Sequence, residues 1–434
     1  MTGKYKNVAV FGLGFIGLPL ALSFSMNGKK VIGVDVSEEL IRELNSGITH
    51  HLEEYKGTKI EEILKKQLRE NNFEATTDAE YALEKCNNVI VTVGIPVAEG
   101  GKLHIEHLES VSRTIACNLK KGDLIVFRGT LVPGFMRDFI KPILEESRLE
   151  AGKDFYLGYA SERVAEGKAF EEFENMPTLV SGINEKSIRE TTGLLEVITK
   201  ADIIPASSFE VVETAKVLEN ISRDINIAMV NEFAKFTRAL GIDIFEVIKV
   251  ANTHKRVNLL NPGPGVGGYC IPNAFYYLNA KGKELDIDLE LSSMARKINK
   301  DTPVRVAQIA LEKLTSKPEE SKICILGMAM KDYSSDDRLS PAFDVIKTLQ
   351  EKGVDVAVYD PAISNEYDYL VEDINKALKD ADGIIILAKQ EDINLKDLDR
   401  FKEMLKDNNP FILDTKNVYT REEVETKGIL YESI

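Results

Sequence analysis

The sequence lacks the features of a membrane protein and of a disulfide-bonded or zinc-stabilised one. No run approaches the roughly 18 consecutive apolar residues of a membrane-spanning helix. The first six residues lead straight into an apolar stretch and lack the core of a signal peptide. The four cysteines form no Cys-x-x-Cys pair and have no histidine cluster beside them, which argues against structural zinc and a disulfide framework. We therefore expect a cytoplasmic protein without a bound metal.

Basic residues are in the minority, with 55 Lys and Arg against 70 Asp and Glu and a formal net charge of −15. Such a chain is poorly suited to general nucleic-acid binding, although a local basic cluster could still hold an anionic ligand. The length of 434 residues, with 44% hydrophobic residues, suits two or three domains.

Short apolar runs alternate with amphipathic stretches in the first part of the chain. The predicted strands cover residues 7–12, 30–35, 88–93 and 123–127, and a helix is expected from about Phe15. This alternation is typical of a parallel, doubly wound sheet.

The pattern then becomes helical, from about Ser208 to Leu240, without a Gly or Pro break. A helix of about 30 residues is long for a globular protein and often marks a domain connector or an oligomer interface. Further helices are predicted at 243–252 and 289–299. A second α/β series has predicted strands at 321–327, 355–360, 383–387 and 411–414.

The predicted architecture is therefore two Rossmann-like, doubly wound domains joined by a central all-helical domain with one long helix. We place the first α/β domain at 1–206, the helical domain at 207–302 and the second α/β domain at 303–434. The last of these has Gly327 but no triple-glycine motif, so we expect it to bind something other than a second dinucleotide.

The motif Gly12-Leu-Gly14-Phe15-Ile16-Gly17 follows the first predicted strand and opens a helix. Its first glycine permits a tight turn, the second lets backbone approach a pyrophosphate, and the third allows close helix–strand packing. Asp35 ends the second predicted strand, 18 residues after Gly17. A carboxylate there accepts from ribose hydroxyls and repels a 2′-phosphate, which favours NAD over NADP. The alternative is a structural turn without a ligand.

Cys270 lies in a glycine-rich stretch that runs from Asn261 to Pro272. Backbone N–H groups in such a loop can stabilise a thiolate and an oxyanion, so Cys270 is a candidate nucleophile. Cys86, Cys117 and Cys324 fall in or beside predicted helices and strands, and we interpret them as inert packing residues.

Lys216 and Asn220 are four residues apart and share one face of the long predicted helix. A lysine on a helix is usually only solvated. Beside an amide on the same face, however, the cation could stabilise an alkoxide or an oxyanion.

Three motifs in this order resemble the UDP-glucose/GDP-mannose dehydrogenase family. They are Lys216-Val-Leu-Glu-Asn220 with Asn231-Glu232, the loop Gly265-Val-Gly267-Gly-Tyr-Cys270, and the segment from Lys331 through Arg338 to Pro341. The resemblance covers nearly the whole chain. It is greatest to the branch of UDP-N-acetylmannosamine and UDP-N-acetylglucosamine 6-dehydrogenases, which serve polysaccharide biosynthesis.

The resemblance implies NAD-dependent oxidation of the C6 alcohol of a UDP-sugar to a uronate, through a thiohemiacetal and a thioester on Cys270. Two other readings stay open. One is a two-electron dehydrogenase of the hydroxyacid or 6-phosphogluconate type. The other is a catalytically weakened regulatory subunit that binds a nucleotide sugar.

The resemblance also assigns residue roles, with Glu162 as general base for a water held with Thr130. The implied catalytic residues are Cys270, Lys216, Asn220, Thr130 and Glu162. The implied cofactor-binding residues are Gly12, Gly14, Phe15, Ile16, Gly17, Asp35, Pro96, Thr130 and Lys331. The implied substrate-binding residues are Glu166, Lys216, Asn220, Arg256, Gly267, Lys331 and Arg338, with Lys168 nearby.

Two further expectations concern charge and assembly. Lys331 and Arg338 can supply positive charge to a substrate pyrophosphate, in a segment that also offers Ser340 as a helix N-cap. Arg256 matches an arginine that family members lend to the neighbouring subunit, which implies a homodimer or a higher homo-oligomer.

The sequence departs from the family pattern at several positions. Ala274 replaces an Asp that helps to organise the catalytic water, which puts thioester hydrolysis in doubt. Gly129 replaces the usual Ser before Thr130, Ser161 the usual Pro before Glu162, and Ile95 the usual Thr before Pro96.

Overall fold

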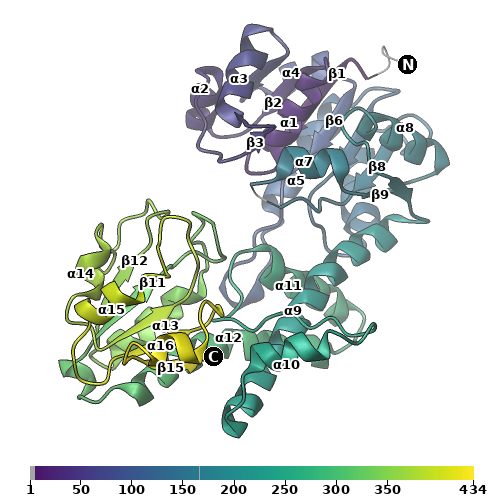
Figure 1. Ribbon diagram of the computed structural model, residues 1–434. Helices are drawn as coiled ribbons and strands as arrows, with labels where there is room; N and C mark the ends of the chain where they lie inside the picture. Colours follow the sequence, from purple (N-terminus) through teal and green to yellow (C-terminus); the bar gives the residue numbers. More distant parts are fainter. Residues whose placement is uncertain (1–4, 166) are drawn as a thin grey trace. The chain divides into compact units, whose positions relative to one another are not determined.

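The computed structural model describes residues 5–165 and 167–434. The chain divides into two compact units (Figure 1). One contains the chain up to Glu219 together with Tyr276–Asp286, and the other contains Asn220–Phe275 and Ile287–Ile434. No helix in the described part of the chain is both long enough and apolar enough to cross a membrane.

The first unit is built on an eight-stranded sheet with the order β10-β9-β8-β7-β6-β1-β2-β5. These strands are β1 (Asn7–Phe11), β2 (Lys30–Val34), β5 (Phe73–Thr76), β6 (Asn88–Val91), β7 (Leu124–Phe127), β8 (Tyr156–Ala160), β9 (Thr178–Gly182) and β10 (Ile203–Pro205). All neighbouring pairs are parallel except β8 and β9. The four strands predicted from the sequence are all parallel, as expected. The antiparallel pair begins at β9, which the sequence analysis did not predict: the connection after β8 returns the chain to the end of the sheet from which β8 leaves.

Helices follow most strands of this unit, and the predicted first helix begins at Gly17 rather than at Phe15. They are α1 (Gly17–Met26), α2 (Glu38–Asn45), α3 (Ile60–Arg69), α4 (Ala79–Lys85), α5 (Glu106–Asn118), α6 (Lys141–Glu145), α7 (Ala169–Asn175) and α8 (Glu185–Leu195). A short hairpin of β3 (Glu54–Tyr55) and β4 (Thr58–Lys59), a 3₁₀ turn at Glu99–Gly101 and a π-helical turn at Met136–Ile140 complete the unit.

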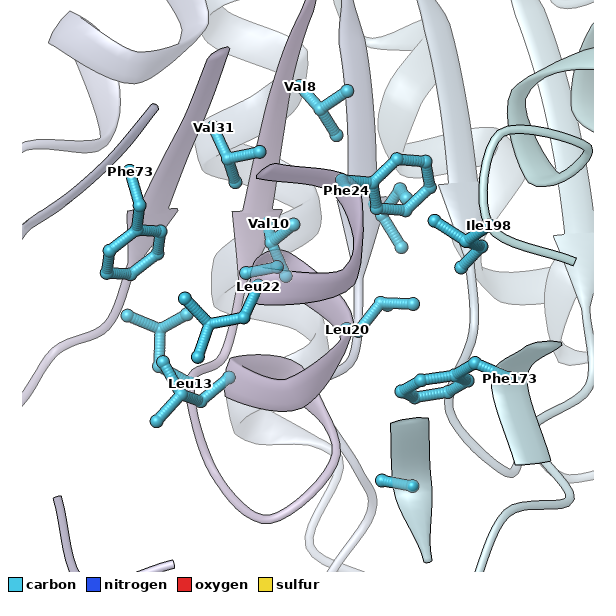
Figure 2. Close-up of a cluster of buried hydrophobic side chains, with 14 of the residues drawn as sticks. Val8, Val10, Leu13, Leu20, Leu22, Phe24, Val31, Phe73, Phe173 and Ile198 are labelled. Atoms are coloured by element: carbon cyan, nitrogen blue, oxygen red, sulfur yellow. The ribbon is translucent and has the colours of Figure 1, made fainter. Parts of the chain in front are cut away.

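The core of this unit surrounds α1, whose residues from Gly17 to Ser25 are all buried. A helix that is buried on every side must pack between other layers rather than on a surface. Figure 2 shows Leu20 and Phe24 beside Phe173 and Ile198, with Val31 and Phe73 on the other side of the cluster. This packing sets the start of α1, and with it the glycine motif, at the carboxyl end of β1.

The helical middle of the chain contains α9 (Phe209–Leu240), α10 (Ile244–Ala251), α11 (Cys270–Glu284) and α12 (Glu290–Lys313). The predicted long helix is confirmed, since α9 has 32 residues. The prediction of a helix over 289–299 is too short, because α12 continues to Lys313 through the buried Pro303. Proline normally ends a helical pattern, and here the packing of α12 outweighs that preference.

The C-terminal sheet has five parallel strands in the order β12-β11-β13-β14-β15. The strands are β11 (Lys322–Leu326), β12 (Asp355–Tyr359), β13 (Gly383–Ile386), β14 (Phe411–Asp414) and β15 (Leu430–Ser433), and the helices are α13 (Pro341–Glu351), α14 (Ile374–Leu378), α15 (Leu398–Met404) and α16 (Arg421–Glu425).

Both faces of this sheet are covered, as a doubly wound sheet requires. Alternate residues of β11 enter opposite core clusters, with Ile323 and Ile325 in one and Cys324 and Leu326 in the other. This alternation follows from the two-residue repeat of a strand. The predicted α/β fold is therefore confirmed.

Candidate active site

The glycine motif has the geometry of a dinucleotide-binding turn. Gly12 has φ of +89°, which a residue with a side chain rarely adopts. A Cβ on Gly17 would lie 1.7 Å from the Gly12 carbonyl oxygen, so α1 can approach the turn only with glycine there. No atom lies within 4 Å of a Cβ built on Gly14. Gly14 therefore leaves open space beside the start of α1, where a pyrophosphate could approach.

Asp35 follows β2 and is tied to the same turn. One carboxylate oxygen accepts from the Leu13 N–H at 2.8 Å, and the other accepts from the Ser37 N–H at 3.1 Å. The carboxylate thus orders the glycine motif in addition to the role predicted for it.

A cavity of about 530 Å³ lies over this turn. It includes the predicted residues Gly12, Gly14, Phe15, Ile16, Gly17 and Asp35. Pro96, Thr130 and Lys331 are not part of its lining. The rest of the lining was not predicted from the sequence and includes Thr77, Ala79, His107, Ser110, Val111 and Thr114. The small polar residues spaced along α5 are the sequence signal that could have revealed it. The open turn, the carboxylate and this volume fit NAD.

We expect Asp35→Asn to relax cofactor choice, because it removes the charge that repels a 2′-phosphate while keeping one oxygen for the Leu13 N–H. A hydrogen bond to a charged group contributes about 1.5–3 kcal/mol, so the NAD preference in kcat/KM should fall about 10- to 100-fold. Steady-state kinetics with both cofactors measures this ratio. Equal use of NAD and NADP by the wild type would contradict the role of Asp35.

Cys270 is the first residue of α11 and is exposed. The prediction that it lies within a loop is thus corrected to a helix start. The first hydrogen bond of this helix runs from the Asn273 N–H to the Tyr269 carbonyl at 3.0 Å. The N–H groups of Cys270 and Ile271 lie before it, in the first turn, where the helix itself offers no acceptor. N–H groups at a helix start can donate to an oxyanion that forms beside the Cys270 side chain.

The glycine-rich loop before Cys270 packs on the segment that begins the C-terminal domain. The Gly268 N–H donates to the Arg338 carbonyl at 3.2 Å. A Cβ on Gly267 would lie 2.7 Å from the Leu339 carbonyl oxygen and 2.8 Å from Pro341. Two of the three family motifs are therefore one packed structure, and Gly267 is needed for their close approach.

Arg338 lies at this junction and has partners already. Its Nε and Nη2 donate to the two oxygens of Asp336 at 2.7 and 2.6 Å, and its guanidinium lies 5.2 Å from the centroid of the Tyr269 ring. An anionic ligand would have to share Arg338 with Asp336 or displace Asp336 from it. The predicted N-cap is confirmed, since Ser340 Oγ accepts from the Ala342 N–H.

Lys331 is exposed and belongs to a wider basic group that our sequence analysis missed. Lys416 and Lys389 lie at the carboxyl ends of neighbouring strands, with Nζ atoms 2.9 and 3.8 Å from Asp332. Only the parallel arrangement of β11, β13 and β14 brings these separate segments together. Lysines at this edge match the crevice where ligands bind in open α/β sheets.

Asparagines along α9 hold the segment that leads to Cys270. The Asn220 side chain donates to the Cys270 carbonyl at 3.1 Å. Asn226 accepts from the Leu260 N–H at 2.9 Å, and the buried Asn231 accepts from the Gly263 N–H at 3.0 Å. The Asn220 amide therefore orients the start of α11.

Glu162 is buried and fully engaged. One oxygen accepts from Arg128 Nε at 2.7 Å, and the other accepts from the N–H groups of Arg163 and Val164 at 2.7 and 2.8 Å. The Arg128 side chain is only 1% exposed and lies over the Phe173 ring. The oxygen that faces Arg128 accepts one hydrogen bond and the other accepts two, so Glu162 is held firmly in place before any water binds, which the sequence did not reveal.

Thr130 and Lys216 are both half-buried. Glu213, in the same unit as Thr130 and Lys216, is fully buried, and the sequence did not single it out. It accepts from the N–H groups of Gly134 and Met136 at 2.6 and 2.8 Å, and burial raises its pKa to about 7. Glu213 thereby ties the loop after Thr130 to the turn of α9 that bears Lys216.

Glu166 lies outside the described residues. Lys168 and Arg256 are exposed. Pro96 is also exposed, and its carbonyl accepts from the His104 N–H at 2.9 Å.

Two of the departures from the family pattern have a local reason. A Cβ at Gly129 would lie 2.8 Å from the Val93 carbonyl oxygen, so this backbone path excludes serine. Ile95 is buried, and its carbonyl accepts from the Tyr277 hydroxyl at 2.6 Å. Nothing in the structure explains Ser161.

The other cysteines differ from one another. Cys86 and Cys324 are buried, and burial raises the pKa of each thiol to about 12, as expected of inert packing residues. The same prediction is wrong for Cys117, which is exposed on α5 because its helix face points away from the core.

Models of three domains of one family match the chain. They are the NAD binding domain of the UDP-glucose/GDP-mannose dehydrogenase family at residues 6–201, its central domain at 210–301 and its UDP binding domain at 324–421. A UDP-N-acetyl-D-mannosamine dehydrogenase of Pyrococcus horikoshii is 33% identical over 95% of both chains. A UDP-N-acetyl-D-glucosamine 6-dehydrogenase of Pseudomonas aeruginosa is 31% identical over 93% of this chain and 96% of its own.

Solved structures agree with these matches. The structure of the UDP-N-acetyl-D-mannosamine dehydrogenase from Pyrococcus horikoshii superposes with a TM-score of 0.89 and 32% identity, and covers 99% of both chains. The first domain is thus an NAD-binding domain, and the chain belongs to the UDP-glucose/GDP-mannose dehydrogenase family of oxidoreductases.

Proposed function

We propose that this protein oxidises the C6 alcohol of a UDP-N-acetylhexosamine, of the manno or gluco configuration, to the uronate with two NAD and one water. The observation that carries the proposal is the exposed Cys270 at the start of α11, directly after a loop that packs on the Lys331–Pro341 segment. The two named relatives act on these two epimers, which supports the substrate class.

The chemistry runs through two oxidations and one hydrolysis. The alcohol loses a proton and a hydride to become an aldehyde. The Cys270 thiolate adds to that aldehyde, and the oxygen gains a proton to form a thiohemiacetal. Loss of a second hydride and a proton leaves a thioester, and water then breaks the C–S bond to release the carboxylate and the thiol. NAD held at the Gly12–Gly17 motif would supply the hydride acceptor for each oxidation.

The residues of this chain would hold the substrate and place charge around it. The Lys216 ammonium would stabilise the oxyanions of the tetrahedral states, helped by the N–H groups at the start of α11. Asn220 would keep that helix start in place. Thr130 and Glu162 would orient the water, while Lys331, Arg338 and residues near Glu166 would bind the nucleotide sugar.

A panel of nucleotide sugars followed by NADH absorbance tests the proposal. Two NADH per sugar, with only UDP-N-acetylhexosamines active, is the expected result. One NADH per sugar would instead indicate the two-electron reaction, and retained binding without NADH would indicate a regulatory subunit.

We also propose that the functional unit is a dimer formed by the helical middle of the chain. Phe236, Leu240 and Val250 on α9 and α10 are 65%, 58% and 62% exposed. Phe236 and Leu240 are one helical turn apart on α9, and exposed apolar side chains that share a helix face are typical of protein interfaces. The exposed Arg256 follows α10 and would reach the active site of the partner.

Mixed dimers provide the test, because Cys270→Ala and Arg256→Ala should each be inactive alone. A mixed dimer has one site with both groups, so random mixing should restore about a quarter of wild-type activity. Activity of re-mixed subunits and sizing of each variant measure this. A fully active monomer, or no recovery in a verified mixed dimer, would rule out shared sites.

Ala274 makes hydrolysis the expected slow step. It is fully buried and lies one helical turn after Cys270 on α11. Without the aspartate that family members carry, a rapid burst of about two NADH per active site should precede a slow phase. Mass spectrometry of quenched enzyme should then detect a sugar adduct on Cys270.

Ala274→Asp should speed that slow phase by about one to two orders of magnitude, since one hydrogen bond to a charged group is regained. Ala274→Asn is the matched control, with nearly the same volume and no charge. Both variants should be less stable than the wild type, because they add atoms at a buried position. Equal slow phases in the two variants would contradict the role of the missing carboxylate.

A further inference from the structure

A buried carboxylate outside the residues considered so far holds the loop before α7. Glu53 is 2% exposed. Its two oxygens accept from the N–H groups of Gly167 and Ala169 at 2.6 and 2.9 Å. Because Ala169 opens α7, the carboxylate also satisfies N–H groups at a helix start.

The rest of this loop is held by nearby carboxylates. Glu162 accepts from Arg163 and Val164, and Glu172 accepts from the Ala165 N–H at 2.6 Å. These two acids belong to the loop and to α7, whereas Glu53 comes from a distant part of the chain. The positions of Gly167 and Ala169 therefore depend on where the segment around Glu53 lies.

That segment contacts the dinucleotide motif at its other end. The His51 ring packs against the Phe15 ring, with centroids 5.5 Å apart. The imidazole is buried, and this burial lowers the pKa of His51. The Nδ1 atom of His51 pairs with Thr49 Oγ1 at 2.7 Å, which fixes the ring.

Tyr55 anchors the same segment to α7. Its hydroxyl donates to Glu174 at 2.7 Å, and its ring packs against Phe170 with centroids 5.9 Å apart. Within seven residues the chain thus touches the motif that receives the cofactor and the loop that carries Glu166.

We propose that residues 49–55 are a positioning element that makes the order of Gly167 and Ala169, at the start of α7, depend on NAD at the glycine motif. A dinucleotide would contact Phe15, whose ring holds His51, and His51 is two residues from Glu53. Filling the motif therefore restrains the carboxylate that holds Gly167 and Ala169. Affinity for the nucleotide sugar should rise with NAD, and the reverse must also hold. That last consequence rests on the proposed function, because it assumes that this loop binds the sugar nucleotide.

Hydrogen exchange of the full-length protein tests the coupling with NAD alone. In the wild type, saturating NAD should slow exchange of the Gly167 and Ala169 amides by about fivefold or more. In His51→Ala, NAD should still bind by calorimetry but should no longer slow these amides. His51→Phe should keep the effect because it keeps the ring contact with Phe15. His50→Ala is the matched control, since the neighbouring His50 side chain is 81% exposed.

Glu53→Gln provides a second, independent variant. It should raise exchange at Gly167 and Ala169 even without NAD, because an amide offers one oxygen where two N–H groups need acceptors. Unchanged exchange in Glu53→Gln, loss of the NAD effect in His50→Ala, or protection of the cofactor cavity without protection of residues 163–169 would overturn the proposal. If no nucleotide sugar is oxidised but NAD still protects this loop, the proposed function fails while the coupling stands.

Discussion

Cys270→Ala is expected to abolish formation of the sugar acid, lowering its rate by at least about a thousandfold. Without the thiolate the aldehyde cannot be held as a thiohemiacetal, so the second oxidation has no covalent substrate. NADH should not exceed one per sugar, and no sugar adduct should appear by mass spectrometry. Binding of NAD should be unchanged, because the glycine motif lies in the other unit.

The exposure of Cys117 determines the control for this experiment. A thiol-labelling assay on the wild type would report two exposed cysteines, Cys117 and Cys270. In a Cys117→Ala background, alkylation should fall on Cys270, and a bound UDP-sugar should protect it. Cys117→Ala itself should keep full activity. Acid formation by Cys270→Ala, or labelling of Cys270 that no nucleotide sugar slows, would show that Cys270 is not the nucleophile.

Glu162→Gln is expected to lower the free energy of unfolding by about 3–5 kcal/mol, whatever its effect on catalysis. The substitution leaves the buried Arg128 guanidinium without a negative partner, and removing one member of a buried ion pair carries a cost of this size. The new amide would also turn an N–H group toward either Arg128 or the N–H groups of Arg163 and Val164. Denaturant unfolding without substrate measures the change.

Two comparisons isolate the cause. Arg128→Met combined with Glu162→Gln removes both charges and should be more stable than Glu162→Gln alone. Glu109→Gln breaks a pair with Arg113, whose side chains are 39% and 49% exposed, and should cost less than about 1 kcal/mol. If Glu162→Gln costs no more than Glu109→Gln, the Arg128 pair does not stabilise the fold as the structure suggests.

Much of the fold could be predicted from local sequence. The α/β, helical, α/β order follows from hydrophobic periodicity, because the repeat of apolar residues in a strand is shorter than that in a helix and both can be recognised in a short stretch of sequence. The glycine motif, the long α9 and the Ser340 cap were recognised for the same reason: backbone conformation and N–H pairing there depend on residues within a few positions. The role proposed for Cys270 likewise rests on its short glycine-rich context and on the family motifs.

Tertiary structure alone decided the rest, because those features depend on partners far apart in the chain. Packing carries α12 through Pro303, the return of the chain after β8 reverses β9, and the orientation of α5 exposes Cys117. The bond from Arg128 to Glu162 joins residues that are 34 positions apart, and the bond from the Gly167 N–H to Glu53 joins residues that are 114 positions apart. A buried charge is stable only beside a partner, and because that partner can come from any part of the chain, the local sequence does not identify it.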